Sequence, residues 1–118
     1  MRRWRYHWRG ATGKGAEGYL RQFLGGFPVV FKLAPLGAPA VYTDGDGCLR
    51  ADGEFAGATV AVVWDGRAIE ITMVVDEDSP AVTTHGLNAY VLGFFRMAGL
   101  SVGGRDRPVL YGRTVFDG

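Results

Sequence analysis

The fold of this chain is decided by residues 59–75, which read TVAVVWDGRAIEITMVV. Two alternating runs flank Asp65-Gly66, and such a pair is a strong β-hairpin signal because both central residues of a type I′ turn need positive φ. With Asp65 and Gly66 as the loop, the pattern predicts three facing pairs: Trp64 with Arg67, Val62 with Ile69, and Val60 with Ile71.

The predicted hairpin has one strongly apolar face, as expected of a ribbon that packs on a core. That face collects Val60, Val62, Trp64, Ile69, Ile71 and Met73. The other face holds Thr59, Ala61, Val63, Ala68, Glu70, Thr72 and Val74. This second face is less polar than a solvated face should be, so a neighbour is expected there too.

Toward the N-terminus the pattern predicts one strand, one helix and a short second strand. Residues 3–9 alternate strictly between basic and aromatic side chains, which is typical of a strand. From residue 16 to residue 24 the apolar positions recur at helical spacing, and Gly25-Gly26 is expected to end that helix. Residues 29–33 are expected to form a strand, and residues 34–39 a connecting loop.

Two further strands are expected before the hairpin, at residues 40–43 and 48–51, with a turn at residues 44–47 and a break at Asp52-Gly53. After the hairpin, Ser79-Pro80 resembles a helix N-cap followed by a first-turn proline. The apolar stripe that follows predicts a helix that starts between Ser79 and about Thr84 and ends at Gly99. Residues 108–116 are expected to form the last strand.

These elements predict an α+β fold in one domain, residues 1–118, with a mostly antiparallel sheet and two helices. With the short segment at residues 29–33 left out of the count, the order is β-α-β-β-β-β-α-β, which resembles a split β-α-β arrangement with an extra hairpin among the middle strands. The length of 118 residues suits a single domain, and 47% apolar with 21% charged residues is typical of a globular protein.

The second predicted helix has no ordinary solvent face. From residue 80 to residue 99 its only permanent charge is Arg96. A helix that is apolar or small nearly all round is usually buried on more than one side. The side opposite the stripe is therefore expected to be an interface with a second copy, a partner protein or the glycine-rich tail, and it holds His85, Ala89, Leu92, Gly93, Arg96 and Met97.

The N-terminal strand suggests nucleic-acid binding as an alternative function. Arginines neutralise phosphates and aromatics stack on bases. Alternation, however, places the aromatics on the face opposite the basic residues, as in an edge strand with aromatic core anchors and a basic outer face. The basic residues of this candidate surface are Arg3, Arg5, His7 and Arg9.

Weaker patterns suggest anion or metal binding. Thr12, Gly13 and Lys14 lie in a glycine-rich loop before the first helix, where an anion could bind. The spacing fails the phosphate-loop pattern. The acidic residues after position 43 do not complete a calcium loop. No metal site and no cofactor are predicted.

Cysteine usage and the N-terminus favour a cytoplasmic protein. The single cysteine, Cys48, excludes an intrachain disulfide. No signal-peptide core follows the basic first residues, and the longest mostly apolar stretch, residues 87–100, is too short and polar to span a bilayer.

No spacing in the chain demands catalysis. Cys48, His85 and Asn88 could supply a nucleophile, a base and an orienting group, yet a lone cysteine near a strand is usually a small core residue. We therefore expect a non-enzymatic protein-binding or assembly module. A component of a homo-oligomer or larger complex and a small inhibitor-like protein fit equally, nucleic-acid binding is the alternative, and small-molecule or anion binding comes third.

The charge is segregated along the chain. Residues 1–42 carry seven basic residues and one acid, whereas residues 43–78 carry two basic residues and nine acids. Such asymmetry can mark a basic surface, an acidic one, or two halves that attract each other on folding or self-association.

Overall fold

The computed structural model describes residues 2–11, 17–76, 82–97 and 110–117. Within them the elements follow the predicted order β-α-β-β-β-β-α-β, which confirms the α+β fold class. The elements are β1 (Arg2–Ala11), α1 (Glu17–Phe31), β2 (Ala40–Thr43), β3 (Leu49–Phe55), β4 (Ala58–Trp64), β5 (Ala68–Asp76), α2 (Thr84–Met97) and β6 (Leu110–Asp117).

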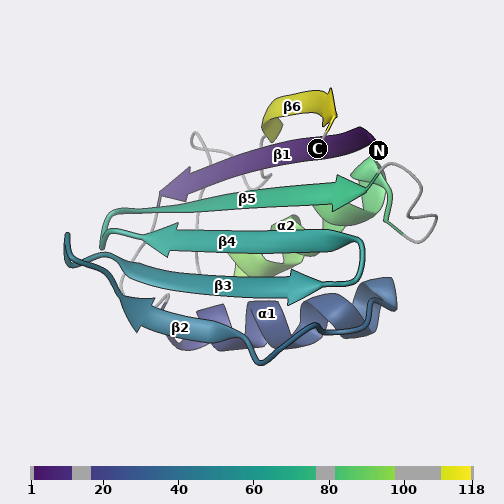
Figure 1. The fold of residues 1–118 in the computed structure, drawn as a ribbon. Helices are drawn as coiled ribbons and strands as arrows, with labels where there is room; N and C mark the ends of the chain where they lie inside the picture. Colours follow the sequence, from purple (N-terminus) through teal and green to yellow (C-terminus); the bar gives the residue numbers. More distant parts are fainter. Residues whose placement is uncertain (1, 12–16, 77–81, 98–109, 118) are drawn as a thin grey trace.

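The strands form one antiparallel sheet in the order β2-β3-β4-β5-β1-β6 (Figure 1). β1 lies between β5 and β6, so the connection through α2 spans β1 as in a split β-α-β arrangement. The expectation of an edge strand at residues 3–9 is therefore wrong, because β6 covers the second side of β1.

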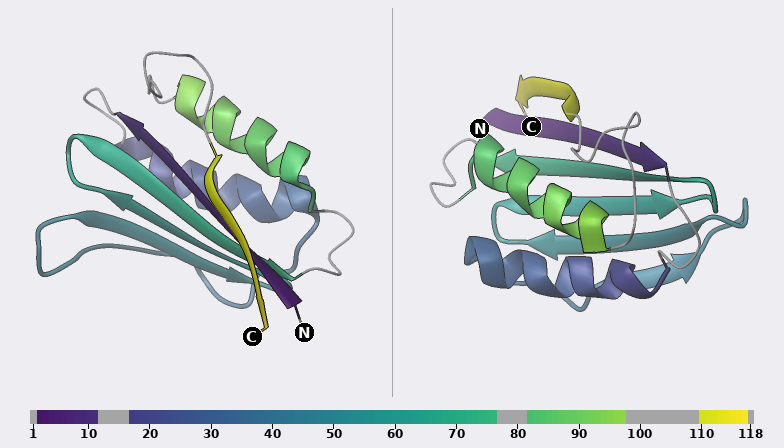
Figure 2. Two further views of the ribbon diagram at one scale, coloured as in Figure 1. Left: turned by 90° about the horizontal axis from the view of Figure 1, so that it is seen from above. Right: turned by 180° about the vertical axis from the view of Figure 1, so that it is seen from behind.

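Both helices cover the same face of the sheet (Figure 2). On that face Tyr6 and Trp8 of β1 are buried, as the alternation predicts. The Trp8 indole donates a hydrogen bond to Asn88 Oδ1 of α2 at 2.8 Å, which satisfies a buried donor. The opposite face, here called the open face, is covered by neither helix, and it carries Thr59, Ala61, Val63, Glu70, Thr72 and Val74.

The hairpin forms with a different loop from the one predicted. The facing pairs are Trp64 with Ile69, Val62 with Ile71, and Val60 with Met73. Asp65 Oδ1 accepts hydrogen bonds from the backbone N–H groups of Arg67 and Ala68, so Asp65 holds the turn from its first position. Within this turn only Gly66 has a positive φ, as in a type II′ turn. The pairing shifts by two residues, so the predicted faces are preserved.

The first helix is longer than predicted, and the expected strand at residues 29–33 is wrong. α1 continues through Gly25, Gly26 and Pro28 because its buried stripe continues with Phe27 and Phe31. An interior proline costs about 3 kcal/mol. Burial of each phenylalanine contributes roughly 1.5–3 kcal/mol, which offsets that cost.

The remaining helix and strand boundaries differ less from the predicted ones. The expected break at Asp52-Gly53 is wrong, because both residues lie inside β3. The turn at residues 44–47 is confirmed by the backbone hydrogen bond from Gly47 N to Asp44 O. α2 begins at Thr84, where Thr83 Oγ1 accepts a hydrogen bond from Gly86 N as a helix cap. The proposed cap at residues 79–80 and helix end at residue 99 lie outside the described residues.

Candidate protein-docking site

Where the structure describes side chains, at residues 3–10, 20–76 and 82–96, the large hydrophobic ones left exposed all come from one segment, residues 29–42. Val29 is 76% exposed, Leu36 66%, Val30 58% and Tyr42 44%. Val29 and Val30 lie in the last turn of α1, Leu36 in the connection to β2, and Tyr42 in β2 itself. Exposed apolar groups that gather in one region mark interaction surfaces more often than scattered ones do.

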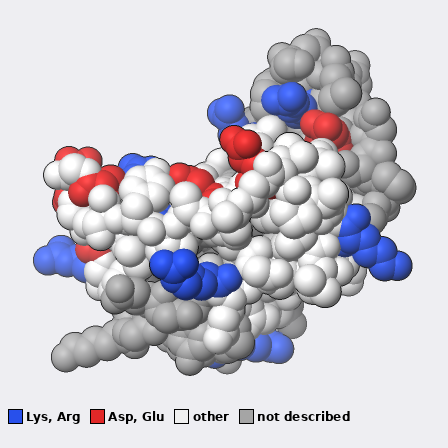
Figure 3. Space-filling view, turned by 60° about the horizontal axis from the view of Figure 1, so that its bottom comes forward, with Lys and Arg blue, Asp and Glu red and all other residues white. Residues whose placement is uncertain are grey.

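We call this region, made of residues 29–30 and 33–43, the apolar edge. Residues 33–43 contain no charged side chain, and residues 34–40 are all exposed. Figure 3 turns the α1 and β2 side of the molecule forward and shows a broad uncharged area with both acidic and basic side chains at its borders. The two segments of the edge are therefore uncharged themselves, and the exposed Lys32 lies between them.

The connection in the apolar edge is fixed to the end of β3. Leu36 N donates to Glu54 O at 2.9 Å, and Ala56 N donates to Ala34 O at 2.8 Å. Pro35 forms an isolated antiparallel bridge with Phe55. These bonds hold Leu36 in an exposed position, so a partner would meet a surface that is already ordered, which lowers the entropic cost of binding.

The end of α1 is fixed as well. Leu33 N donates to Pro28 O at 3.0 Å, and Lys32 has φ of 55°, which together form a Schellman cap. Lysine adopts this left-handed conformation at a cost that glycine would avoid. The cap holds Val29 and Val30 in a regular last turn, and both point away from the core stripe of α1.

The apolar edge is unsuited to strand addition. An added strand pairs through free backbone N–H groups, and prolines on an edge strand remove them. Pro35 and Pro39 both lie in the edge, and β2 has only four residues. Binding here would therefore depend on side-chain contacts rather than on continuation of the sheet.

Within the apolar edge, the Tyr42 hydroxyl makes a polar contact. It donates to Asp52 Oδ2 at 2.7 Å. This hydrogen bond to a carboxylate raises the pKa of Tyr42. The phenol is therefore a neutral group at ordinary pH, and it adds no charge to the surface.

The predicted interface on α2 lies on the outer side of the helix layer. His85, Ala89, Gly93 and Arg96 are exposed and Leu92 is half-buried, whereas the side chain of Met97 lies outside the described residues. Ala89 and Gly93 line a groove of about 280 Å³ between α1 and α2. The floor and the remaining wall of the groove are formed by Gln22, Phe23, Tyr90 and Phe94.

The basic residues of β1 lie together on the open face, but they have acidic neighbours. Arg3 Nε is 3.4 Å from Asp76 Oδ1, and Arg9 Nε is 3.6 Å from Glu70 Oε1. His7 Nδ1 is 3.2 Å from Thr72 Oγ1. The described open face carries the arginines 3, 5, 9 and 50 and the acids 52, 54, 70 and 76 in equal number. Balanced charge weakens phosphate attraction, so the structure gives the nucleic-acid alternative little support.

The structure does not bring the candidate catalytic groups into a catalytic arrangement. Asn88 accepts the hydrogen bond from the Trp8 indole. Partial burial, with the nearby Asp44, Asp65 and Asp46 carboxylates, raises the pKa of the Cys48 thiol, the opposite of an activated nucleophile. The anion-site candidates Thr12, Gly13 and Lys14 lie outside the described residues.

The acidic turn before β3 serves its own backbone. Asp44 Oδ1 accepts hydrogen bonds from Asp46 N and Cys48 N, and the Arg50 guanidinium contacts its other oxygen. The hydrogen bond from Arg50 lowers the pKa of Asp44. Across the described part of the chain, no three His, Cys, Asp or Glu side chains are grouped so that they could hold a metal ion.

Sequence reasoning missed the apolar edge, although a signal for it was present. Eleven consecutive residues, 33–43, lack any charge, and this run was interpreted only as a loop and a strand. The pattern predicts Val29 and Val30 as part of a short strand. Their exposure follows from the extension of α1, which turns both valines away from the buried stripe.

Comparison with protein-family models, with curated proteins and with solved structures found no match for this chain. Neither helix has, in its described residues, the length and apolar character needed to cross a bilayer. Function must therefore be argued from the surfaces described above.

Proposed function

We propose that this protein is a non-enzymatic protein-binding or assembly module that docks through its apolar edge. One observation carries the proposal: among the side chains that the structure describes, at residues 3–10, 20–76 and 82–96, every large hydrophobic one left exposed lies between residues 29 and 42. The backbone bonds that fix Leu36 support it, because an ordered apolar surface binds at a lower entropic cost than a mobile one.

The first partner that we propose is a second copy of the chain. Residues 33–43 are uncharged, so two copies can meet there without bringing like charges together. Closed self-association through one shared patch is also the commonest form of assembly among soluble proteins. A different protein with an apolar patch is the other possibility within this proposal.

Sedimentation velocity over a range of concentrations tests the proposal. We expect the wild-type chain to self-associate and Leu36→Asp to weaken association at least tenfold, about 1.4 kcal/mol, because a buried unpaired carboxylate opposes docking. Gly45→Asp is the matched control, since it adds the same charge to an exposed loop where a Cβ meets no atom within 4 Å. Equal weakening by both variants, or none by Leu36→Asp, would contradict the proposal.

The groove between α1 and α2 is a second candidate surface, favoured by its apolar lining. A Cβ added to Gly93 meets no atom within 4 Å, so Gly93→Arg places a charge in the groove without a steric clash in the folded chain. If association depends on this groove, Gly93→Arg should weaken it while Leu36→Asp has no effect. The two variants therefore distinguish the two surfaces.

A further inference from the structure

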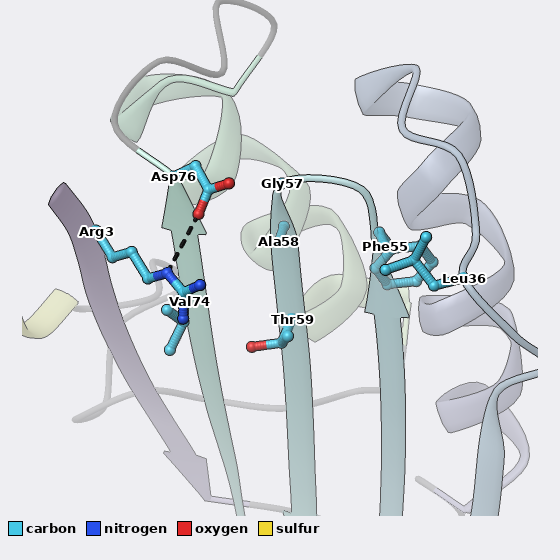
Figure 4. A pocket seen from close by; sticks show the side chains of 8 residues that line it. All are labelled: Arg3, Leu36, Phe55, Gly57, Ala58, Thr59, Val74 and Asp76. Carbon is cyan, nitrogen blue, oxygen red and sulfur yellow. Dashed lines mark ion pairs between the residues drawn. The ribbon is translucent and has the colours of Figure 1, made fainter. Parts of the chain in front are cut away.

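A pocket of about 230 Å³ lies at the end of the open face, directly beside the apolar edge (Figure 4). Leu36 and Phe55 form one side of it, and Arg3 and Asp76 lie on the other side. Between them are the β4 residues Ala58 and Thr59, the preceding Gly57, and Val74 of β5. Leu36 belongs to the apolar edge, so a protein docked there would also cover this pocket.

Three polar side chains line the pocket. Arg3 Nε lies 3.4 Å from Asp76 Oδ1 as an ion pair, and the two side chains remain 42% and 28% exposed. Arg3 Nε is itself buried, and despite this ion pair it forms no hydrogen bond within the described residues. Thr59 is exposed, and its hydroxyl points toward the side of the pocket on which Arg3 lies (Figure 4). The pocket thus has unused hydrogen-bonding capacity.

The size and lining of the pocket suit a single side chain. Pockets that hold drug-sized ligands measure about 300–1,000 Å³, and this one is smaller. Phe55, Leu36 and Val74 provide apolar contacts for a short stem. Arg3 provides donors, Asp76 provides acceptors, and Thr59 can do either.

We infer that this pocket binds a primary carboxamide on a short apolar stem, presented by the protein docked on the apolar edge. In a second copy of the chain this group is the exposed Gln22, because the other carboxamide, Asn88, accepts from Trp8. The inference rests on the proposed function and names the anchor that the docked partner supplies. The carboxamide oxygen accepts from the Arg3 guanidinium, its NH₂ group donates to the Asp76 carboxylate, and the stem lies over Val74 and Thr59 in the direction of Leu36.

A charged anchor fits this pocket less well. A carboxylate attracted by Arg3 would meet the negative charge of Asp76, and an ammonium attracted by Asp76 would meet Arg3. Because these two groups are already paired, neither offers an uncompensated charge. A neutral group with a donor and an acceptor side by side satisfies both partners at once.

Titration of the full chain with propionamide, followed by backbone and arginine side-chain NMR signals, tests the inference directly. We expect saturable shifts centred on Gly57, Ala58, Thr59 and Arg3 Nε–H. Propionate and propylamine, which have nearly the same size, should bind at least tenfold more weakly. No saturable binding of propionamide, or equal binding of all three probes, would overturn the inference.

Two variants make the test specific. Arg3→Met keeps an apolar side chain of similar length and should abolish the propionamide shifts. Arg9→Met is the matched control, because Arg9 forms the corresponding ion pair with Glu70 farther along the same two strands, and it should leave the shifts intact. Loss of binding in both variants, or in neither, would also overturn the inference.

The same variants in the sedimentation assay identify the source of the carboxamide. If Arg3→Met associates more weakly than Arg9→Met, the result supports a side chain of the docked partner as the source of the carboxamide. Unchanged association, with propionamide binding intact in the wild type, overturns that assignment and points to a free small amide. Failure of propionamide to bind while Leu36→Asp still disrupts association would reject the pocket inference and leave the proposed function standing.

Discussion

Three glycines in the helices should respond to alanine in opposite ways. Alanine is more favourable than glycine in a helix interior by about 1 kcal/mol. At Gly25 and Gly93 the added Cβ meets no heavy atom within 4 Å, so Gly25→Ala and Gly93→Ala should each stabilise the monomer by up to roughly that amount. At Gly26 the added Cβ would lie 2.9 Å from the Tyr90 hydroxyl oxygen.

Tyr90 is poorly placed to move away from that Cβ. Its ring centroid lies 5.0 Å from that of Phe23, 5.8 Å from that of Phe27 and 5.7 Å from that of Phe31. Its hydroxyl donates to the carbonyl oxygen of Phe23. Displacement would leave a partly buried phenol without its acceptor, a loss of about 1–3 kcal/mol that exceeds the propensity gain. We expect Gly26→Ala to destabilise the fold by about 1 kcal/mol.

Urea denaturation followed by circular dichroism measures these differences at a protein concentration low enough to keep the chain monomeric. The predicted gap between Gly25→Ala and Gly26→Ala is about 2 kcal/mol, with no change in the slope m. Equal stability of these two variants would refute the packing argument for Tyr90. Destabilisation by Gly93→Ala would refute the claim that this helix face is open in the monomer.

Three further perturbations follow from particular contacts. Lys32→Gly should raise the free energy of unfolding by about 1 kcal/mol in the same assay, because Lys32 has a left-handed φ of 55°. If the free energy of unfolding does not rise, the left-handed conformation of Lys32 in the cap of α1 is contradicted. Asn88→Ala should lower the free energy of unfolding by about 1–3 kcal/mol, because the Trp8 indole N–H loses its acceptor. An unchanged free energy of unfolding would mean that a water molecule replaces the Asn88 amide as the acceptor. Burial raises the pKa of Tyr90 to about 12, so its neutral phenol stabilises the fold fully below pH 10, and that contribution should disappear as the pH rises from about 10 through 12. Tyr90→Phe should remove this alkaline loss in a pH series of urea titrations, and an unchanged profile would argue against it.

The local patterns predicted the element order because they arise from periodicity alone. Alternation at residues 3–9 and 59–75 identifies strands, and the spacing of Leu87, Val91 and Phe95 identifies α2. These patterns also assigned the buried faces correctly, including the burial of Tyr6 and Trp8. The periodicity of apolar residues directly reflects which face of a helix or strand is buried. A single sequence is therefore enough to assign those faces.

The errors arose where tertiary packing outweighs local preference. Gly25, Gly26 and Pro28 indicate a helix end, yet burial of Phe27 and Phe31 continues α1 past them. Asp65 was placed in the centre of its turn, whereas its carboxylate holds the turn through two backbone bonds. Both outcomes depend on which contacts form in three dimensions.

The candidate site was harder to predict than the fold. The absence of charge in residues 33–43 could be read from the sequence, but exposure could not, since an uncharged segment can equally be buried. The pocket joins Arg3 to Leu36 and Phe55, residues that only the sheet order brings together. The spacing of these residues in the sequence therefore does not indicate that they line one pocket.

Amide hydrogen exchange of residues 33–43 at two protein concentrations is the most direct test of docking through the apolar edge. If a second copy docks there, exchange of the exposed Gly37 and Ala38 amides should slow as concentration rises, while the exposed loop around Gly45 should exchange at an unchanged rate. Exchange at Gly37 and Ala38 that stays equally fast under conditions in which the chain self-associates would contradict docking through this edge.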